Sequence, residues 1–286
     1  MFLKLLVRHA LLLVLAILLG GLIGATLVRF APGFDADEAQ LDPNRSAASI
    51  EALRTGHAEE RQVIRYYGTY LMNLARGEFG ESRTFRRPVR ELLSERAGVT
   101  WQFVSLGLLA GCTLGLLAAA GAVYSTVLDR FCSLLCALFL SVPAAILAIA
   151  ALVLDAPVWI CLAGVVFPRV YRYTRDLLCG AMTAPHVLAA RARGVGPGSL
   201  FMRHVLPQAM PQTMALLGIM VSTAMAADIP VEVLAGIPGI GQLAWQAASG
   251  RDLPVLVTMT MLLGAVAIAA NALADFGAHA WRTNPA

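Results

Sequence analysis

The sequence contains few charged residues and almost no lysine. Charged side chains make up 14% of its 286 residues, whereas an ordinary soluble domain has roughly 25%. Lys4 is the only lysine in the sequence. A phosphate-binding P-loop ends in Gly-Lys followed by Ser or Thr, because the lysine must reach the terminal phosphates of the nucleotide. The sequence therefore excludes a P-loop ATPase site, and we expect no catalytic residue in this chain.

Cysteine is also too scattered for a metal site. The five cysteines contain no Cys-x-x-Cys pair, and all lie in or beside apolar segments. Cys132 and Cys136 share a helical face, but a metal site needs further His or carboxylate ligands, and none lies nearby in the sequence. We therefore expect no metal, and we interpret the cysteines as small hydrophobic residues. They are Cys112, Cys132, Cys136, Cys161 and Cys179.

The basic residues do not form a nucleic-acid-binding stripe. The formal net charge is +4, but the arginines are dispersed along the chain and lack the clustering that is typical of nucleic-acid-binding proteins. We therefore expect no nucleic-acid partner.

Long apolar runs dominate the sequence instead. Hydrophobic residues make up 58% of the chain, and the mean hydropathy is +0.70. Several runs reach about 20 residues, the length that an α-helix needs to cross a bilayer, and a soluble fold of this size could not bury them all. The sequence therefore predicts an all-α integral membrane protein with six transmembrane helices. The predicted spans cover residues 9–29, 101–123, 131–153, 157–174, 212–229 and 254–276.

The positions of lysine and arginine indicate the orientation of these spans. Short cytoplasmic loops retain Lys and Arg, and Lys4 and Arg8 precede the first span. We therefore expect both termini in the cytoplasm, together with the basic loop 176–210. The region 31–100 then lies outside, where its balanced charges predict a partly helical extracytoplasmic cap. The predicted domains are the first transmembrane helix at residues 1–30, the cap at 31–100 and a five-helix core at 101–286.

Three arginines follow one another at intervals of three at the inner end of the fourth span. They are Arg169, Arg172 and Arg175. A long basic side chain near a helix end can extend along apolar surface and place its charge among lipid headgroups. We interpret all three as contacts to phosphate headgroups.

A Gly- and Pro-rich segment separates the fifth and sixth spans. Residues 235–241 are too apolar for an open loop and too rich in Gly and Pro for a membrane helix. Such backbone exists at membrane depth only against protein or a water-filled cavity. The segment is a candidate re-entrant or pore-lining element, and a simple external turn is the alternative. Its candidate pore residues are Pro238, Gly239 and Gly241.

Two acidic residues precede this segment at the outer end of the fifth span. Charged residues near membrane level are costly and are default candidates for function. Asp228 and Glu232 either line the outer mouth of a path through the membrane or sit in interfacial water. The sequence leaves these two alternatives open.

The basic loop between the fourth and fifth spans has the pattern of a docking element. Residues 185–194 predict a short helix with small residues on one side, ended by Gly194, which permits a left-handed turn. A second short basic helix is predicted to end at Pro207. Small side chains allow another surface to approach closely. The alternative, an amphipathic helix on anionic lipid headgroups, accounts for the arginines but not for the spacing.

This spacing resembles the cytoplasmic signature of the membrane subunits of ABC importers, in the dipeptide, oligopeptide and nickel permease branch. That signature reads Glu-Ala-Ala, three residues, Gly, nine residues, an apolar residue, one residue, Leu-Pro. Leu188 occupies the position of the signature's glutamate. The signature positions are Ala189, Ala190, Gly194, Leu206 and Pro207. Further landmarks of the branch follow in the same order at residues 29–33, 77–82, 87–89, 140–143, 238–241 and 251–254.

The resemblance implies a pore-forming permease subunit in the bacterial cytoplasmic membrane that works by alternating access. Its partners would be a second, paralogous permease subunit, two ATPase subunits, an extracytoplasmic solute-binding protein and membrane lipid. The ATPase subunits would bind ATP and Mg, and this chain would bind no cofactor itself. Docking to an ATPase is assigned to Ala189, Ala190 and Gly194, and transmission of its motion to His204, Leu206 and Pro207. Arg191 and Arg193 complete the coupling set.

Two other classes of membrane protein remain alternatives. A stand-alone secondary transporter or channel would need charged or broken-helix elements near the bilayer midplane. An intramembrane hydrolase would need a Ser in a Gly-x-Ser context paired with a helical His, but the histidines lie outside the predicted mid-membrane zone. Members of the resembling branch carry peptides, nickel, some sugars and other solutes. The sequence does not decide among these, and a peptide-like solute is our first expectation.

Overall fold

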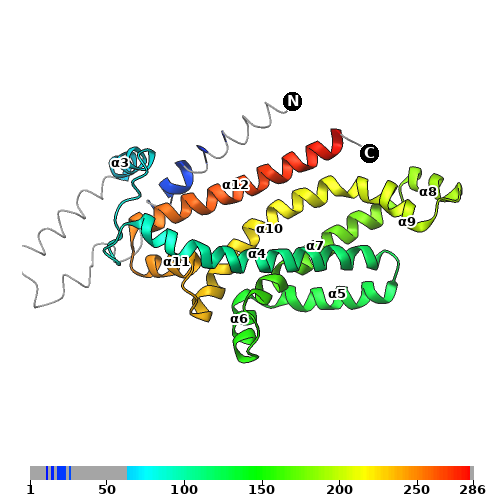
Figure 1. Ribbon diagram of the computed structural model, residues 1–286, viewed down its shortest axis with the longest axis horizontal. Coiled ribbons are helices and arrows are strands. Elements are labelled where there is room, and N and C mark those ends of the chain that lie inside the picture. Colours follow the sequence, from blue (N-terminus) through cyan, green and yellow to red (C-terminus); the bar gives the residue numbers. More distant parts are fainter. Residues whose placement is uncertain (1–10, 12–13, 16–17, 24–25, 27–62, 284–286) are drawn as a thin grey trace, which may run out of the picture. The chain divides into compact units, whose positions relative to one another are not determined.

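The computed structural model describes residues 11, 14–15, 18–23, 26 and 63–283 (Figure 1). The regular elements of this part are helices, apart from an isolated antiparallel bridge between Glu81 and Pro88. This confirms the all-α prediction. Most of the first predicted span, and residues 31–62 of the predicted cap, lie outside the described residues. The chain divides into two compact units, one of Met1–Ala97 with Leu243–Ala265 and one of Gly98–Gln242 with Val266–Ala286.

Tyrosines of α3 stabilise the described part of the first unit. Tyr67 and Tyr70 are buried and form a cluster with Val257 and Met261. The hydroxyl oxygens of Tyr70 and Thr258 lie 2.6 Å apart and share a hydrogen bond. The helices that contribute to this unit are α3 (Val63–Ala75), the start of α4 (Val89–Ala122), most of α11 (Ile240–Ser249) and the first part of α12 (Leu253–Thr283).

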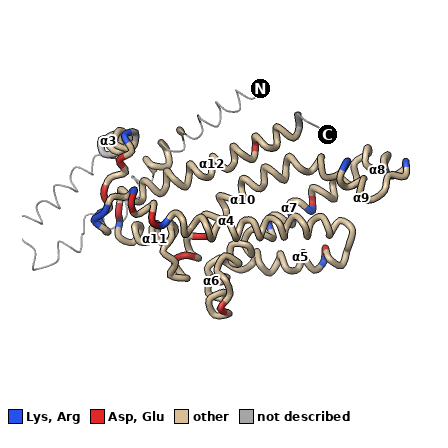
Figure 2. Tube along the Cα trace, viewed as in Figure 1, with Lys and Arg blue, Asp and Glu red and all other residues tan. Residues whose placement is uncertain are grey.

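The second unit is organised around α7, which packs against α5, α6 and α10. Most residues in the first half of α7 are buried, so this helix forms the core of the unit. The second half of α4 and most of α10 carry no charged residue (Figure 2). The remaining elements are α5 (Thr126–Ser141), α6 (Ala144–Val153), α7 (Trp159–Met182), α8 (Pro185–Ala192), α9 (Pro197–Leu200), a π-helical turn η2 (Phe201–Val205) and α10 (Leu206–Ala235).

The third predicted span is broken rather than straight. Residues 131–153 were expected to form one helix, but α5 ends at Ser141 and α6 begins at Ala144 after a bend of 101°. Pro143 explains the break, because proline lacks an N–H for the helix and pushes the preceding residue out of the α region. Val142 accordingly has an extended backbone, with φ −101° and ψ 122°.

The prediction that a helix ends at Pro207 is wrong. The chain is helical from Pro197 to Ala235 without a stop. Pro207 lies in the first turn of α10, directly after η2. A proline at this position removes one amide donor, and the wider π-helical turn before it absorbs the misfit. The result is one continuous helix that links the loop after α7 to the fifth predicted span.

Three described helices are long and apolar enough to cross a membrane, and the bent pair of α5 and α6 is a fourth candidate. The three are Val89–Ala122, Pro197–Ala235 and Leu253–Trp281. They include the second, fifth and sixth predicted spans. The fourth predicted span is helical as part of α7, but α7 carries Arg169, Arg172 and Arg175, which lower its apolar character.

Candidate functional site

The helix α8 has sharply defined ends. It begins at Pro185, whose missing N–H costs nothing in the first turn of a helix. It ends at Ala192, with Arg193 as the C-cap residue and Gly194, at φ +84°, directly after it. The amide of Gly194 donates to the carbonyl of Arg191 at 3.0 Å, and the amide of Val195 donates to that of Ala190 at 3.3 Å. This is the Schellman arrangement that favours glycine, so the predicted helix and its glycine stop are present.

The two faces of α8 have different environments. Val187 and Ala190 are buried within the second unit, in a cluster with residues of α7, η2 and α10. Leu188 is 49% exposed, and Ala189 is exposed beside it. The docking role expected of Ala190 needs correction, because a fully buried methyl group cannot contact a partner. Its small size instead lets α8 lie close to its own core.

The other coupling residues divide between surface and core. Arg191, Arg193 and Gly194 are exposed, whereas His204, Leu206 and Pro207 are half-buried. The carbonyl of Pro207 accepts a hydrogen bond from the Trp281 indole at 3.3 Å. The chain before η2 also contacts the α4–α5 turn, because the Tyr124 hydroxyl donates to the carbonyl of Pro197 at 3.4 Å. The half-buried residues His204, Leu206 and Pro207 therefore connect α8 to the long helices.

The acidic pair of α10 is buried, contrary to both predicted environments. Asp228 is 1% exposed and Glu232 is 0% exposed, so neither carboxylate lies at an open mouth or in interfacial water. The Thr100 hydroxyl donates to one oxygen of Glu232 at 2.5 Å, and the amide of Gln242 donates to the other at 3.0 Å. Gln242 is in the first turn of α11, where amides have no partner within the helix and the helix dipole favours negative charge. Glu232 thus acts as a structural cap of α11.

The Gly- and Pro-rich segment wraps around this carboxylate. A left-handed Gly236, with φ +67°, ends α10, and α11 begins four residues later at Ile240. A Cβ on Gly239 would lie within 1.9 Å of a carboxylate oxygen of Glu232, and one on Gly241 would lie 2.8 Å from the Cα of Ile229. These two glycines therefore permit close packing. Pro238 lies between Gly236 and Gly239. Among the described residues, it makes no contact that would identify it as a pore residue.

Two landmarks far apart in the sequence meet in the first unit, which the sequence did not indicate. The Ser82 hydroxyl donates to a carboxylate oxygen of Asp252 at 2.5 Å, and the amide of Thr84 donates to the same oxygen at 3.0 Å. Asp252 is 0% exposed and directly precedes α12, so its charge also faces the positive end of that helix. The pair joins the turn after α3 to the start of α12.

We expect Asp252→Ala to lower the free energy of unfolding by about 2 kcal/mol or more, because a buried hydroxyl and a buried amide each lose their acceptor. Asp252→Asn is the matched control, because it keeps an acceptor oxygen in the same place and should cost less than half as much. Thermal unfolding of both variants in detergent measures the difference. Equal losses in the two variants would show that these hydrogen bonds do not hold the segments together.

A row of glycines on α4 forms a second feature that the sequence reading missed. Gly107, Gly111 and Gly115 recur every four residues, and a Cβ on each would lie 2.5 to 2.9 Å from side-chain atoms of α7. Small residues at this spacing allow membrane helices to approach closely. The partners on α7 are Leu162, Val166 and Val170, also spaced by four. The recurrence of glycine at every fourth residue was the signal in the sequence that could have predicted this packing.

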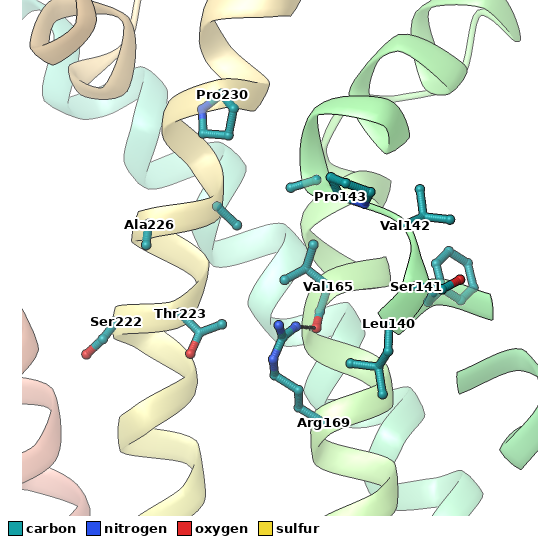
Figure 3. Close-up of a pocket in the computed structure, with 13 residues that line it drawn as sticks. Leu140, Ser141, Val142, Pro143, Val165, Arg169, Ser222, Thr223, Ala226 and Pro230 are labelled. Carbon is teal, nitrogen blue, oxygen red and sulfur yellow. Dashed lines mark hydrogen bonds between the residues drawn. The ribbon is translucent and has the colours of Figure 1, made fainter. Parts of the chain in front are cut away.

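A cavity of about 720 Å³ lies in the second unit, between the α5–α6 break, α7 and α10 (Figure 3). Of the described residues that line it, Arg169 alone is charged. Among the described residues, no group of three His, Cys, Asp or Glu side chains could hold a metal ion.

Arg175 has a different environment from Arg169. Its guanidinium forms an ion pair with Asp129 at 2.7 Å and another with Asp176 at 3.0 Å. The expectation that all three arginines reach lipid headgroups therefore fails for Arg175, which is paired within the protein, and Arg172 is exposed.

Comparisons with known proteins agree with this architecture. A protein of Brucella suis that is named as a peptide permease is 27% identical over 95% of this chain and 94% of its own length. A dipeptide transport system permease protein of Lactococcus lactis is 22% identical over 84% of this chain and 85% of that protein. A solved structure of the MetNI methionine ABC transporter, in inward-facing conformations, has a TM-score of 0.56 at 19% identity and covers 67% of this chain and 97% of that chain. This likeness supports the fold.

The family comparison confirms the resemblance drawn from the cytoplasmic signature. Residues 111–280 match the family described as binding-protein-dependent transport system inner membrane component. This range is more than half of the chain, and it contains α8, the glycine row from Gly111 onward, the cavity, and Glu232 with the start of α11 that it caps. The chain therefore belongs to the family of inner membrane components of binding-protein-dependent ABC transport systems.

Proposed function

We propose that this permease subunit forms one half of a membrane path through which an ATP-driven importer moves peptides into the cell. As a member of its family, the chain is a permease component and not itself an ATPase. The peptide substrate is supported by relatives that are named as peptide and dipeptide permeases. The observation that carries the importer mechanism is the exposed outer face of α8, held on a short helix with defined ends.

The proposed topology has six spans with both termini in the cytoplasm. The helical part of residues 11–26, α4, the bent pair α5–α6, α7, α10 and α12 would be the spans. The basic loop that contains α8 supports this orientation, because short loops rich in arginine stay in the cytoplasm. Residues 31–88 would then lie outside, where a solute-binding protein delivers its load.

The proposed complex contains a second permease subunit and two ATPase subunits that bind ATP and Mg. One ATPase would receive the outer face of α8, formed by Leu188, Ala189 and Gly194. Nucleotide binding would move α8, and the buried contacts of Val187 and Ala190 would pass this motion to α7 and α10. Such a system is a two-state element that is biased by nucleotide on one side and by the loaded binding protein on the other.

Ala189→Trp tests the docking surface. Because Ala189 is exposed, a larger side chain there should leave the fold intact while it blocks the close approach of an ATPase. We expect an unchanged apparent Tm of the permease but at least about a tenfold loss of solute-stimulated ATP hydrolysis, equivalent to about 1.4 kcal/mol or more. Both are measured on the complex reconstituted in membranes.

Thr126→Trp is the matched control, because Thr126 is also exposed but lies at the start of α5 and not on α8. It should retain stimulated hydrolysis. Full stimulation in Ala189→Trp, or equal losses in the two variants, would reject α8 as the docking element.

A further inference from the structure

The cavity beside the α5–α6 break has the properties of a solute-binding site. The family assignment does not define such a site. Its volume, about 720 Å³, is within the range of ligand pockets in proteins. It is bordered by Phe139–Ala144 at the break, by Val165 and Arg169 of α7, and by five residues of α10, which are Ser222, Thr223, Ala226, Ala227 and Pro230 (Figure 3). A broken helix in a membrane is tolerated where the free backbone groups face protein or a water-filled space.

Arg169 dominates the electrostatics of this cavity. One of its nitrogens donates to the carbonyl of Val165, one turn earlier in the same helix, at 2.5 Å. A guanidinium carries five N–H donors, so several remain for a ligand. None of the residues that line the cavity is acidic, and a charge in a membrane helix is costly without a compensating group. The cavity therefore has a fixed cation and no lining anion.

The hydroxyl groups that line the cavity add no charge of their own. The hydroxyls of Ser141 and Thr223 each donate to a carbonyl of their own helix, at 2.8 Å and 3.1 Å. Ala144, at the start of α6, lines the cavity as well, and the first amides of a helix have no partners within it and carry partial positive charge. The N-terminus of α6 thus adds to the field of Arg169.

We infer that this cavity lies on the translocation path and binds an anionic group of the solute, of the type of a peptide's terminal carboxylate, through Arg169. The inference rests on the proposed function and extends it, because it names the chemistry that the membrane subunit recognises. Arg172, one turn further along α7, does not line the cavity, and both arginines are exposed. Arg172 retains the headgroup interpretation and provides a matched control for Arg169.

Charge-selective labelling of Ser222→Cys tests the inference. Ser222 lines the cavity from α10, the helix opposite the part of α7 that carries Arg169 (Figure 3), so the new thiol reports on the local potential. The probes are a sulfonate-bearing and a trimethylammonium-bearing methanethiosulfonate, applied to the full-length chain in detergent with the parent chain as background for the native cysteines. We expect Arg169→Gln to lower the ratio of anionic to cationic labelling rates by at least about fivefold. Arg172→Gln should leave this ratio nearly unchanged.

The outcome shows whether the charge of Arg169 sets the potential in the cavity. If that charge did not face the cavity, the ratio would be the same in all three proteins, and the inference would fail. A second cysteine at the exposed Thr126 should show no dependence on Arg169, and a dependence there as large as at position 222 would also overturn the inference. Because this labelling needs no ATPase, its failure would leave the docking test of α8 untouched.

Protection of the Ser222→Cys thiol identifies the source of the anion. We expect trialanine to slow labelling at lower concentration than trialanine amide, which lacks the carboxylate, and Arg169→Gln should remove this difference. Equal effects of the two peptides would reject the carboxylate assignment. Protection by phosphatidylglycerol but not by trialanine would place a lipid headgroup in the cavity and would overturn the solute assignment.

Discussion

Gly239→Ala is expected to lower the free energy of unfolding by about 3 to 5 kcal/mol. The added Cβ would occupy the position of the Glu232 carboxylate, at 1.9 Å from one of its oxygens. The carboxylate would have to leave the hydroxyl of Thr100 and the amide of Gln242, and a buried charge would lose its partners. For a chain of this size about 1 kcal/mol corresponds to about 2 to 4 °C. Thermal unfolding in detergent should therefore show an apparent Tm lower by at least about 6 °C.

A double-mutant cycle shows whether this collision is the cause. In the Glu232→Ala background the same glycine substitution should cost little, because the group that it displaces is absent, so the two effects should be strongly non-additive. Gly180→Ala is the control in a helix interior, since no heavy atom lies within 4 Å of its added Cβ, and it should have little effect or stabilise the helix. Equal costs of Gly239→Ala in both backgrounds would contradict the capping role of Glu232.

Gly111→Leu should abolish the folded subunit. A Cβ on Gly111 would lie 2.8 Å from the Cβ of Val166 and 3.0 Å from the carbonyl of Ala163. Neither of these atoms is the end of a flexible side chain, so α4 and α7 would have to separate. Even one added methyl in a tightly packed site costs about 1 to 3 kcal/mol, and leucine adds three further carbons. We expect the monodisperse peak to disappear in size-exclusion chromatography, with Gly111→Ala retaining a smaller peak.

Gly98→Leu is the control on the same helix. Gly98 is exposed, and no heavy atom lies within 4 Å of its added Cβ, so this substitution should preserve the peak. A folded Gly111→Leu protein with an unchanged apparent Tm would mean that α4 and α7 do not pack through the glycine row.

The helix α8 was the most predictable part of the chain, because its signals are local. Proline in the first turn and glycine directly after the last turn act through their own backbone conformations, so Pro185 and Gly194 define α8 without help from other elements. The same local rules failed for Pro207. A proline near a helix start and a proline that stops a helix look alike in sequence, and only the π-helical turn before it shows which one is present.

The environment of each charged residue was the least predictable part. Asp228 and Glu232 were placed at an open surface, since charge near a membrane surface usually contacts water. The structure buries both, because hydrogen-bond donors from α4 and α11 surround the Glu232 carboxylate. The three arginines of α7 share one spacing, yet Arg175 is paired with Asp129, Arg169 lines a cavity and Arg172 is exposed.

The sequence by itself determined the helical membrane class, the family signature and the ends of α8, since apolar run length and the backbone limits of proline and glycine act over a few residues. Only the tertiary structure decided which polar groups are caps, which are pairs and which face a cavity. The physical reason is distance along the chain. Thr100 and Glu232 are 132 positions apart, and Ser82 and Asp252 are 170 apart, so their partnership depends on how the helices pack and not on any local pattern.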